Sequence, residues 1–520
     1  MDTLTIDLFE PGMSALHRAG LGGLACSLVR LSWPKDEYSV EDGRRVTLRW
    51  PGGPAGAGAF LERLYSSAFG LEHGLIHLPG AYGKVGPSAQ VKALLQRGLS
   101  QTILQFGPNR KKRGSDLRLT YQIDDRPMFV EHQDLLDYTH RGAWRDLVSK
   151  DGALKDVVSI AGTIAPGFIR RHNAHPSSEV KQPPGLAIAL HFALVGTLSL
   201  YLAGGKGVLI IPDVENLDNF VARRSWLNPE GPNSCQVGNP ADAALQAQVR
   251  LRGPSKSTLA HVASRSLDAA FRSGVDRCHA LLFSSTVWNK NQKARTKALT
   301  VDPGDDGLDR FEYVMSIEAF KPRVAEAKPE KKGDPPRWFW ADSVCRALIA
   351  ENVANRRPWF ENFRSLVVGP DGKNDEQKAR RVSYEKEGLH EMIDQRWEDN
   401  GEELLVKSVH EAMLNCFGKI WEDSGHDQTT SRKRRERQMD RWRIAFAHAK
   451  TSDDVRAALS DMWSRAGRVQ SLMESWPKLL PVICDDQRWQ LNRDLALLAL
   501  CSYKPRKQWE AEVSTTPIED

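Results

Sequence analysis

The sequence predicts an α+β protein: a mixed amino-terminal domain with antiparallel sheet elements, followed by a carboxy-terminal α-helical bundle. Three observations support this. The chain has 520 residues, more than one core of about 100–200 residues accommodates. Hairpin signals and interleaved strand and helix patterns fill its first part, and helical patterns dominate the rest. The expected organisation is a mixed α/β domain at 1–320, a linker or exposed loop at 321–337, a helical bundle at 338–505 and a flexible tail at 506–520.

Composition indicates a soluble cytoplasmic protein. Hydrophobic residues make up 41% and charged residues 27%, which is typical of a globular chain. The seven cysteines are odd in number and contain no CxxC pair, as expected of reduced, mostly buried thiols. The first residues carry acids and no basic region, so no secretory signal is visible. The net charge is only +6, so the clustering of the cations is more informative than their number.

The chain opens with a short alternating strand at residues 4–8 and a helix at residues 14–31, for which Ser14 is the expected N-cap. Gly20, Gly22 and Gly23 interrupt the helical pattern. Each glycine lowers the stability of a helix by about 1 kcal/mol relative to alanine. We therefore expect them to allow close approach of another backbone or to mark a break.

Further elements follow from local signals. Asp42-Gly43, between the alternating residues 38–40 and 46–50, is the strongest hairpin signal in the chain. A helix is expected at residues 60–68, and strands at 117–123, 128–130, 208–211, 280–283 and 311–320.

Residues 186–203 are apolar over a length that spans a bilayer. They contain His191, Thr197 and Ser199, and only single cations flank them. We interpret them as a buried central helix, and no membrane partner is expected.

The helical part begins after a proline-rich, charged stretch at 321–336. Leu405, Val409, Met413 and Cys416 recur at helical spacing and predict packing as a bundle. Helices are expected at 341–355, 384–398, 402–422, 432–450, 452–474 and 487–501.

Residues 287–297 combine amides, cations and one indole without an acid. Asn and Gln pair with base edges, Lys and Arg neutralise phosphates, and Trp stacks on a base. Because an apolar run at 280–283 precedes them, we expect a loop held at a strand end. The alternative is an ordinary solvated basic loop. The candidate residues are Trp288, Asn289, Lys290, Asn291, Gln292, Lys293, Arg295 and Lys297.

Other basic clusters in the sequence are also candidates for nucleic-acid binding. Each alone is more often a solvated face, but together they favour nucleic acid. On the expected helix at 432–450, three arginines share one face, while Met439 and Trp442 share another. The candidates are Arg110, Lys111, Lys112 and Arg113, then Lys256, and then Arg434, Arg437 and Arg441.

No catalytic residue, metal site or cofactor is predicted. His172 and His175 have no nearby carboxylate set, and His426-Asp427 alone is a weak match to metal-dependent phosphohydrolases. The glycine-rich stretch around Lys206 precedes a strand instead of following one, unlike a phosphate-binding loop. A metal-dependent nuclease is nevertheless the competing hypothesis.

Three segments carry a family resemblance. They are LTIDLFEPGMSALHRAGLGGL at 4–24, VWNKNQKART at 287–296 and NRRPWFENF at 355–363. They resemble the large subunit of type I CRISPR surveillance complexes (Cascade), of an I-B-like branch, and the likeness spans most of the chain.

The resemblance implies a non-catalytic subunit of an antiviral defence complex, with a helical carboxy-terminal region similar to the Cascade small subunit. Such a subunit contacts the 5′ handle of the guide RNA, recognises the protospacer-adjacent motif on double-stranded target DNA, helps to form the R-loop and guides the displaced strand. Its partners would be the backbone, handle-capping and small subunits, and a helicase-nuclease or transposition proteins. The protein reads the short motif and base pairing reads the rest, a division of labour that RNA-guided effectors of another class also use.

Roles follow residue by residue. Asn289, Lys290, Asn291, Gln292 and Lys293 are assigned to the motif and to strand opening, with Trp288 as a packing anchor. Residues 110–113, Lys256, Arg295 and Lys297 are assigned to phosphates, and the arginine face at 434–441 to the displaced or target strand. A structural interaction subunit without nucleic-acid contacts is the third alternative.

Overall fold

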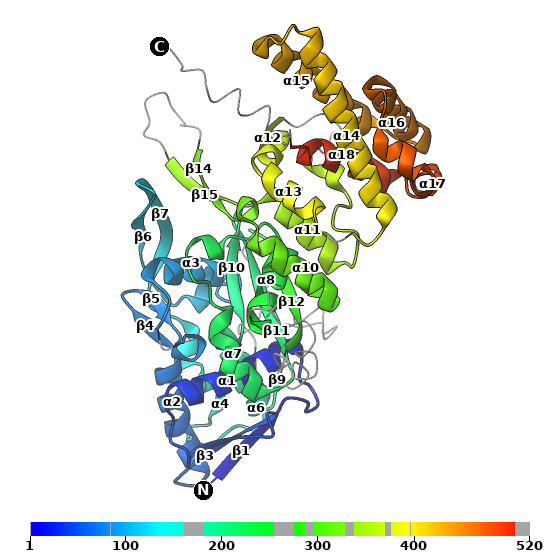
Figure 1. The fold of residues 1–520 in the computed structure, drawn as a ribbon. Coiled ribbons are helices and arrows are strands. Elements are labelled where there is room, and N and C mark those ends of the chain that lie inside the picture. The colour runs from blue at the N-terminus through cyan, green and yellow to red at the C-terminus, as the bar shows by residue number, and fades with distance from the viewer. Residues whose placement is uncertain are drawn as a thin grey trace. The chain divides into compact units, whose positions relative to one another are not determined.

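The computed structural model (Figure 1) describes residues 2–83, 85–160, 181–253, 275–285, 296–327, 337–369, 376–395 and 397–504. Contacts divide the chain into two compact units. Unit 1 comprises Met1–Glu312 and Pro322–Asp342, and unit 2 comprises Tyr313–Lys321 and Ser343–Asp520. Unit 1 is mixed and contains antiparallel sheets, whereas unit 2 is a helical bundle, which confirms the predicted fold class.

The amino-terminal sheet of unit 1 has the strand order β1-β3-β2 and is antiparallel. Its strands are β1 (Asp2–Asp7), β2 (Tyr38–Glu41) and β3 (Arg45–Trp50). Asp42 and Gly43 both have positive φ, at 55° and 61°, because tight hairpin turns require the left-handed region that these residue types tolerate. The predicted hairpin is confirmed.

Helix α1 (Ala15–Arg30) begins at the predicted cap. The Ser14 side chain accepts from the His17 backbone N–H, and the His17 ring accepts from the Ser14 N–H at 3.2 Å. This reciprocal arrangement is a capping box in which histidine replaces the usual Glu or Gln.

The glycines of α1 allow it to touch the backbone of α6 (Pro184–Gly196). A Cβ at Gly20 would overlap the Ala189 carbonyl oxygen, and one at Gly23 would overlap the Phe192 carbonyl oxygen. Gly196 of α6 lies equally close to α1 in return. Close backbone approach, one of the two expectations for these glycines, is confirmed, and α1 continues through them without a break.

Residues 186–203 do not form one helix, contrary to the prediction. Helix α6 ends at Gly196, and β10 (Leu198–Leu202) follows after Thr197. An apolar run alone does not distinguish a buried helix from a buried strand. Within the described part of the chain, no helix has the length and apolar character needed to cross a bilayer.

A four-stranded antiparallel sheet forms the centre of unit 1, in the order β10-β11-β12-β13. Its other strands are β11 (Lys206–Val214), β12 (Val275–Phe283) and β13 (Thr296–Val301), so the strands predicted at 208–211 and 280–283 are confirmed. Helices α1, α3 and α8 pack against it. The remaining elements of this part are α2 (Ala57–Ala68), β4 (Gly70–Glu72), β5 (Leu75–His77), α3 (Ala89–Ser100), α4 (Trp144–Leu147), β8 (Val158–Ser159), β9 (Lys181–Gln182), α7 (Leu217–Arg223) and α8 (Pro240–Arg252).

Two hairpins extend unit 1. The first joins β6 (Lys112–Ile123) to β7 (Arg126–Asp137) through Asp124 and Asp125, both with positive φ, and confirms the strands predicted at 117–123 and 128–130. The second pairs β14 (Arg323–Ala327) with β15 (Arg337–Ala341). It lies in the stretch expected to be a linker or exposed loop, and residues 328–336 are outside the described part.

The strand predicted at 311–320 is wrong, because these residues belong to α10 (Gly304–Ser316) and a short 3₁₀ turn, Glu318–Phe320. Buried Phe311, Val314, Ile317 and Phe320 recur every three residues, which matches a helical face and not an alternating strand. The boundary between the two units falls within α10.

Unit 2 contains the predicted helices with two differences. The helix expected at 452–474 breaks at Gly467, whose φ is +79°, because this conformation suits only the end of a helix. The helix expected at 384–398 is shorter and follows an unpredicted α12. The helices are α11 (Val344–Ala354), α12 (Glu376–Tyr384), α13 (Lys386–Ile393), α14 (Asn400–Asp423), α15 (Gln428–His448), α16 (Ser452–Ala466), α17 (Gln470–Cys484) and α18 (Trp489–Ser502).

The segment 355–363, one of the three that carry the resemblance, is part of the core of unit 2. Trp359, Phe360 and Phe363 are at most 5% exposed. Asn362 is left-handed, and its N–H donates to the buried Asp494 carboxylate of α18 at 2.8 Å. Burial raises the pKa of Asp494 to about 6. This segment is therefore a structural turn.

Candidate nucleic-acid interface

The strand end that leads into the amide-rich segment is fixed by pairing on both sides. Phe283 of β12 is paired with Thr296 of β13 and with Gly207 of β11. Ser284 follows, and its carbonyl oxygen accepts a hydrogen bond from Gln105 Nε2 at 2.8 Å. The described residues next to the segment are thus held by a rigid sheet. The segment's own candidates lie outside the described residues: Trp288, Asn289, Lys290, Asn291, Gln292, Lys293 and Arg295.

Gln105 also connects this strand end to the first basic cluster. Its carbonyl oxygen accepts from Arg110 Nη2 at 3.4 Å. Arg110 is half-buried, and burial, together with the nearby Arg113 guanidinium, lowers the pKa of Arg110. Arg110 therefore helps to hold the cluster, whereas Lys111, Lys112 and Arg113 are exposed.

One arginine that the sequence reasoning missed, Arg145, joins this cluster. A Cβ placed on Gly142 would lie 3.2 Å from Arg145 Nη1 and 3.7 Å from Lys111 Nζ, so these two cations converge over one glycine. Arg141 precedes them and pairs with Asp137 at 3.4 Å. We call Lys111, Lys112, Arg113 and Arg145 the hairpin-base cluster. In the sequence, the only signal for Arg145 was its position four residues after Arg141. Its approach to Lys111 depends on the fold.

Lys297 lies near the same end of the central sheet. Paired residues share a face in an antiparallel sheet. Leu282 pairs with both Lys297 and Val208, so these three residues share a face. Lys206 lies two residues before Val208 on the same strand and therefore on the same face. The exposed side chains of Lys206 and Lys297 are thus on one face of the sheet. The turn before Lys206 follows β10 and precedes β11, so it lies between two paired strands, whereas the usual phosphate-binding loop leads from a strand into a helix. Lys256 lies outside the described residues.

Helix α15 carries the last cluster on an exposed face. Its 21 residues contain seven arginines and lysines and two acids. Arg434, Arg437 and Arg441 are all exposed, while Trp442 and Phe446 are buried on the other side. The separation into a cationic and an apolar face follows the helical period, as predicted.

Two other arginines of unit 1, Arg18 and Arg277, are structural. Asp213 of β11 is 1% exposed and accepts from Arg18 and from Arg277 Nε, the latter at 2.9 Å. Burial alone would raise the pKa of Asp213, but the hydrogen bonds from His279, Arg18 and Arg277 hold it well below its usual value. Arg18 fixes α1 to the sheet and Arg277 bonds β12 to β11, so we do not assign these two arginines to nucleic acid.

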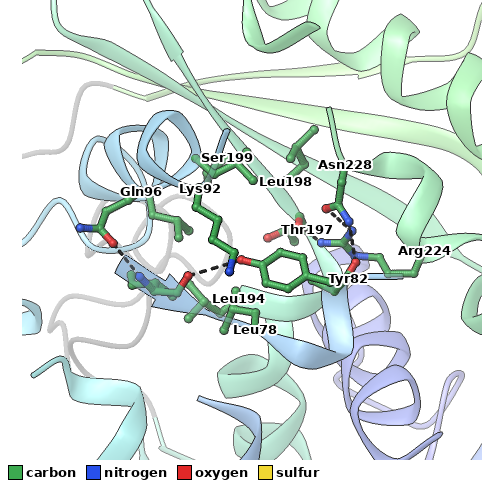
Figure 2. Close-up of a pocket in the computed structure, with 14 residues that line it drawn as sticks. Leu78, Tyr82, Lys92, Gln96, Leu194, Thr197, Leu198, Ser199, Arg224 and Asn228 are labelled. Carbon is green, nitrogen blue, oxygen red and sulfur yellow. Dashed lines mark hydrogen bonds between the residues drawn. The ribbon is translucent and has the colours of Figure 1, made fainter. Parts of the chain in front are cut away.

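The small pocket shown in Figure 2 is also structural. Buried Arg224 donates from Nη2 to the Thr197 carbonyl at 2.8 Å. It also donates from Nε to the Val195 carbonyl at 2.6 Å. It therefore caps the carboxyl end of α6, and burial lowers the pKa of Arg224 to about 10. The cavity measures about 30 Å³, room for about two water molecules.

The residues of the nuclease alternative have local structural roles. Asp427 is the N-cap of α15 and accepts from the Thr430 N–H at 2.9 Å. His426 has positive φ, and its ring packs edge-on against Trp421. Among the described residues, no group of three or more His, Cys, Asp or Glu is arranged to hold a metal ion. His172 and His175 lie outside the described part.

Comparison with known proteins supports the resemblance. A model of the DevT N-terminal domain matches residues 5–191, and a model of the DevT C-terminal domain matches residues 394–520. The chain is 32% identical over 538 residues to the CRISPR-associated protein Cas8a1/Csx13 of Myxococcus xanthus (strain DK1622), with 98% of this chain and 90% of the relative covered. The match confirms the CRISPR resemblance drawn from the residues. The chain therefore belongs to the family of CRISPR-associated Cas8a1/Csx13 proteins.

Proposed function

We propose that this chain is the non-catalytic large subunit of a type I RNA-guided DNA surveillance complex in the cytoplasm. It contacts the 5′ handle of the guide RNA, recognises the protospacer-adjacent motif, helps to open the target DNA and recruits a downstream effector. Family membership supports the general role. The structural observation that carries the proposal is the connection from the hairpin-base cluster, through Arg110 and Gln105, to the strand end at Ser284.

That connection provides the two things that recognition of duplex DNA needs. Phosphate contacts set the register of a protein on DNA, and amides and arginines read base edges. The exposed cations Lys111, Lys112 and Arg113 are held next to the strand that enters the amide-rich segment. We propose that the cluster holds the backbone while Asn291 and Gln292, with their neighbours, read the flanking motif.

The helical unit has a different task in this proposal. The exposed face of α15 carries Arg434, Arg437 and Arg441, which suits tracking of a single strand by charge. We assign this face to the displaced or target strand. We further propose that the bundle at residues 338–505 corresponds to the small-subunit-like part and contacts the small subunit.

The proposal is tested by omission and by substitution in the assembled complex. Binding of target duplexes is measured over a library of flanking motifs, with the complete complex, without this chain, and with Asn291→Ala plus Gln292→Ala. We expect the preference for particular motifs to be lost without the chain and weakened in the double variant. Gln487→Ala plus Gln490→Ala, two exposed amides in unit 2, is the matched control and should keep the preference. Unchanged motif preference without the chain would refute the proposal.

The competing classes give opposite results. A nuclease would cleave DNA when the purified chain is supplied with Mg²⁺ or Mn²⁺, and His426→Ala would abolish the cleavage. A purely structural subunit would assemble at any salt concentration and would cross-link to no nucleic acid. We expect neither outcome, because Asp427 is used as a helix cap and the cation clusters are exposed.

A further inference from the structure

A two-stranded ribbon in unit 1 presents an aromatic ring between two arginines. The ribbon consists of β14 and β15, and β15 lies against β7 of the neighbouring hairpin (Figure 1). Because side chains alternate along a strand, each residue type of the ribbon can be assigned to one of two faces. The two faces have different chemistry.

The inner face packs on the β6–β7 hairpin. Trp340 Nε1 donates to the Tyr121 hydroxyl at 3.0 Å, and the Arg126 guanidinium lies 5.0 Å from the centre of the Trp338 ring. Both tryptophans are only partly exposed. These contacts fix the ribbon, and they account for the two tryptophans by packing alone.

The outer face is partly exposed: Phe339 and Arg337 are exposed, and its other four residues are partly buried. Phe339 is 47% exposed and is paired with Ala325. Arg337, paired with Ala327, lies on one side of the ring along the ribbon, and Arg323 lies on the other, across from Ala341. The other described residues of this face of the ribbon are the alanines Ala325, Ala327 and Ala341. The two arginine positions are separated by about 13 Å along the strands, with Phe339 midway between them.

We propose that this outer face binds an unpaired stretch of nucleic acid, with one base stacked on Phe339 and phosphates held by Arg323 and Arg337. The inference rests on the proposed function, since it assigns a further contact to a nucleic-acid-binding subunit. Every base has a π face that an exposed aromatic ring accepts without regard to sequence, and flanking cations neutralise the backbone. In a duplex these base faces are covered by their neighbours, so the geometry selects single strands. A single exposed phenylalanine is common on protein surfaces, and the arginines on either side are what point to this ligand.

The test measures binding of the full-length chain to labelled oligothymidine, oligouridine and a DNA duplex by fluorescence anisotropy. Phe339→Ala should weaken binding of the single strands by about tenfold, with little change for the duplex, and Phe339→Trp should restore it. Phe9→Ala is the matched control. Phe9 is 49% exposed and has the Arg44 guanidinium 5.1 Å from its ring centre, and its loss should change none of the affinities. Thermal unfolding of each variant shows whether it folds as the wild type does.

A photoreactive phenylalanine analogue at position 339 supplies a second measurement. It should cross-link to single-stranded oligonucleotides, and the relative yields with DNA and RNA distinguish the two strands. If Phe339→Ala leaves single-strand binding intact while substitution of Lys111, Lys112 and Arg113 reduces it, this inference fails and the proposed function stands. If cross-links at position 339 reach only protein in the assembled complex, the face is a protein contact and the inference fails. If the chain binds none of the oligonucleotides, both fail.

Discussion

The hairpin-base cluster gives the sharpest prediction. Lys111, Lys112 and Arg113 are exposed and adjacent, and the structure shows no carboxylate bonded to any of them among the described contacts. Replacing all three by glutamine removes three positive charges from the base of β6 while keeping polar side chains of similar length. Because the cluster is assigned to phosphates, we expect weaker binding and a weaker dependence of binding on salt.

The magnitude follows from counterion release. Each neutralised phosphate contributes about 0.9 to the slope of log K against log salt for duplex DNA, and about 0.7 for single strands. Loss of three contacts therefore lowers the slope by about 2–3. Over a fourfold rise in salt, a slope difference of about 2.5 means that the wild type loses roughly thirtyfold more affinity than the variant.

The assay is a titration of target duplex with the assembled complex at several salt concentrations. Arg44→Gln plus Arg45→Gln is the control. These arginines are also exposed, but Arg44 Nε lies 2.7 Å from Asp7 and Arg45 Nη2 lies 3.3 Å from Asp42. Their loss should shift the slope by less than about 0.5 unit. An unchanged slope in the triple variant, or a change no larger than in the control, would refute the assignment.

Three further predictions concern other parts of the chain. Arg437→Gln plus Arg441→Gln on α15 should lower the salt slope for single-stranded DNA by about 1.4, and an unchanged slope would contradict the strand assignment. Gly23→Ala should lower the free energy of unfolding, measured in urea, by about 3 kcal/mol, because the new Cβ would overlap the backbone of α6. Gly418 has open space around it, so Gly418→Ala should raise the free energy of unfolding by about 1 kcal/mol. Equal effects of the two substitutions would refute the packing argument. Burial lowers the pKa of His140 to about 4, so the native ring stays neutral while the unfolded one takes up a proton below about pH 6.5. The contribution of the neutral His140 ring to stability is therefore present above about pH 6.5 and is lost towards pH 4, by up to about 1.4 kcal/mol per pH unit. In urea unfolding at pH 7.5 and 5.5, His140→Phe should reduce the dependence of the free energy of unfolding on pH. A pH dependence as large as that of the wild type would contradict this assignment to His140.

Local signals predicted the local structure well. Asp42-Gly43 and the Ser14 cap act over a few residues, and each formed the turn or helix start that its chemistry favours. The arginine face of α15 was predictable for the same reason, since the helical period is a property of one segment. Apolar runs were less reliable. In the run 186–203 the buried helix was expected correctly as far as Gly196, but burial on all sides hid the change to a strand at Leu198. Residues 311–320 were assigned to a strand although their buried residues recur every three positions, as on one face of a helix.

Tertiary convergence could not be predicted from one sequence. The glycines of α1 indicated a close neighbour, but that the neighbour is α6, roughly 170 residues away, is decided by packing. Likewise, Arg145 reaches Lys111 only because the turn after β7 returns to the base of β6. The hydrogen bond from Gln105 to Ser284, which connects the cluster to the strand end, joins residues 179 positions apart.

We propose above that this chain works within an RNA-guided complex. The most direct measurement is affinity purification of the tagged full-length chain, co-expressed with its neighbouring gene products and a CRISPR array, followed by sizing and sequencing of the bound nucleic acid. We expect a small RNA of one defined length that carries array-derived guide and handle sequences, together with the partner subunits. Purification of the assembled partners with no RNA on them, or with only heterogeneous cellular RNA, would contradict it.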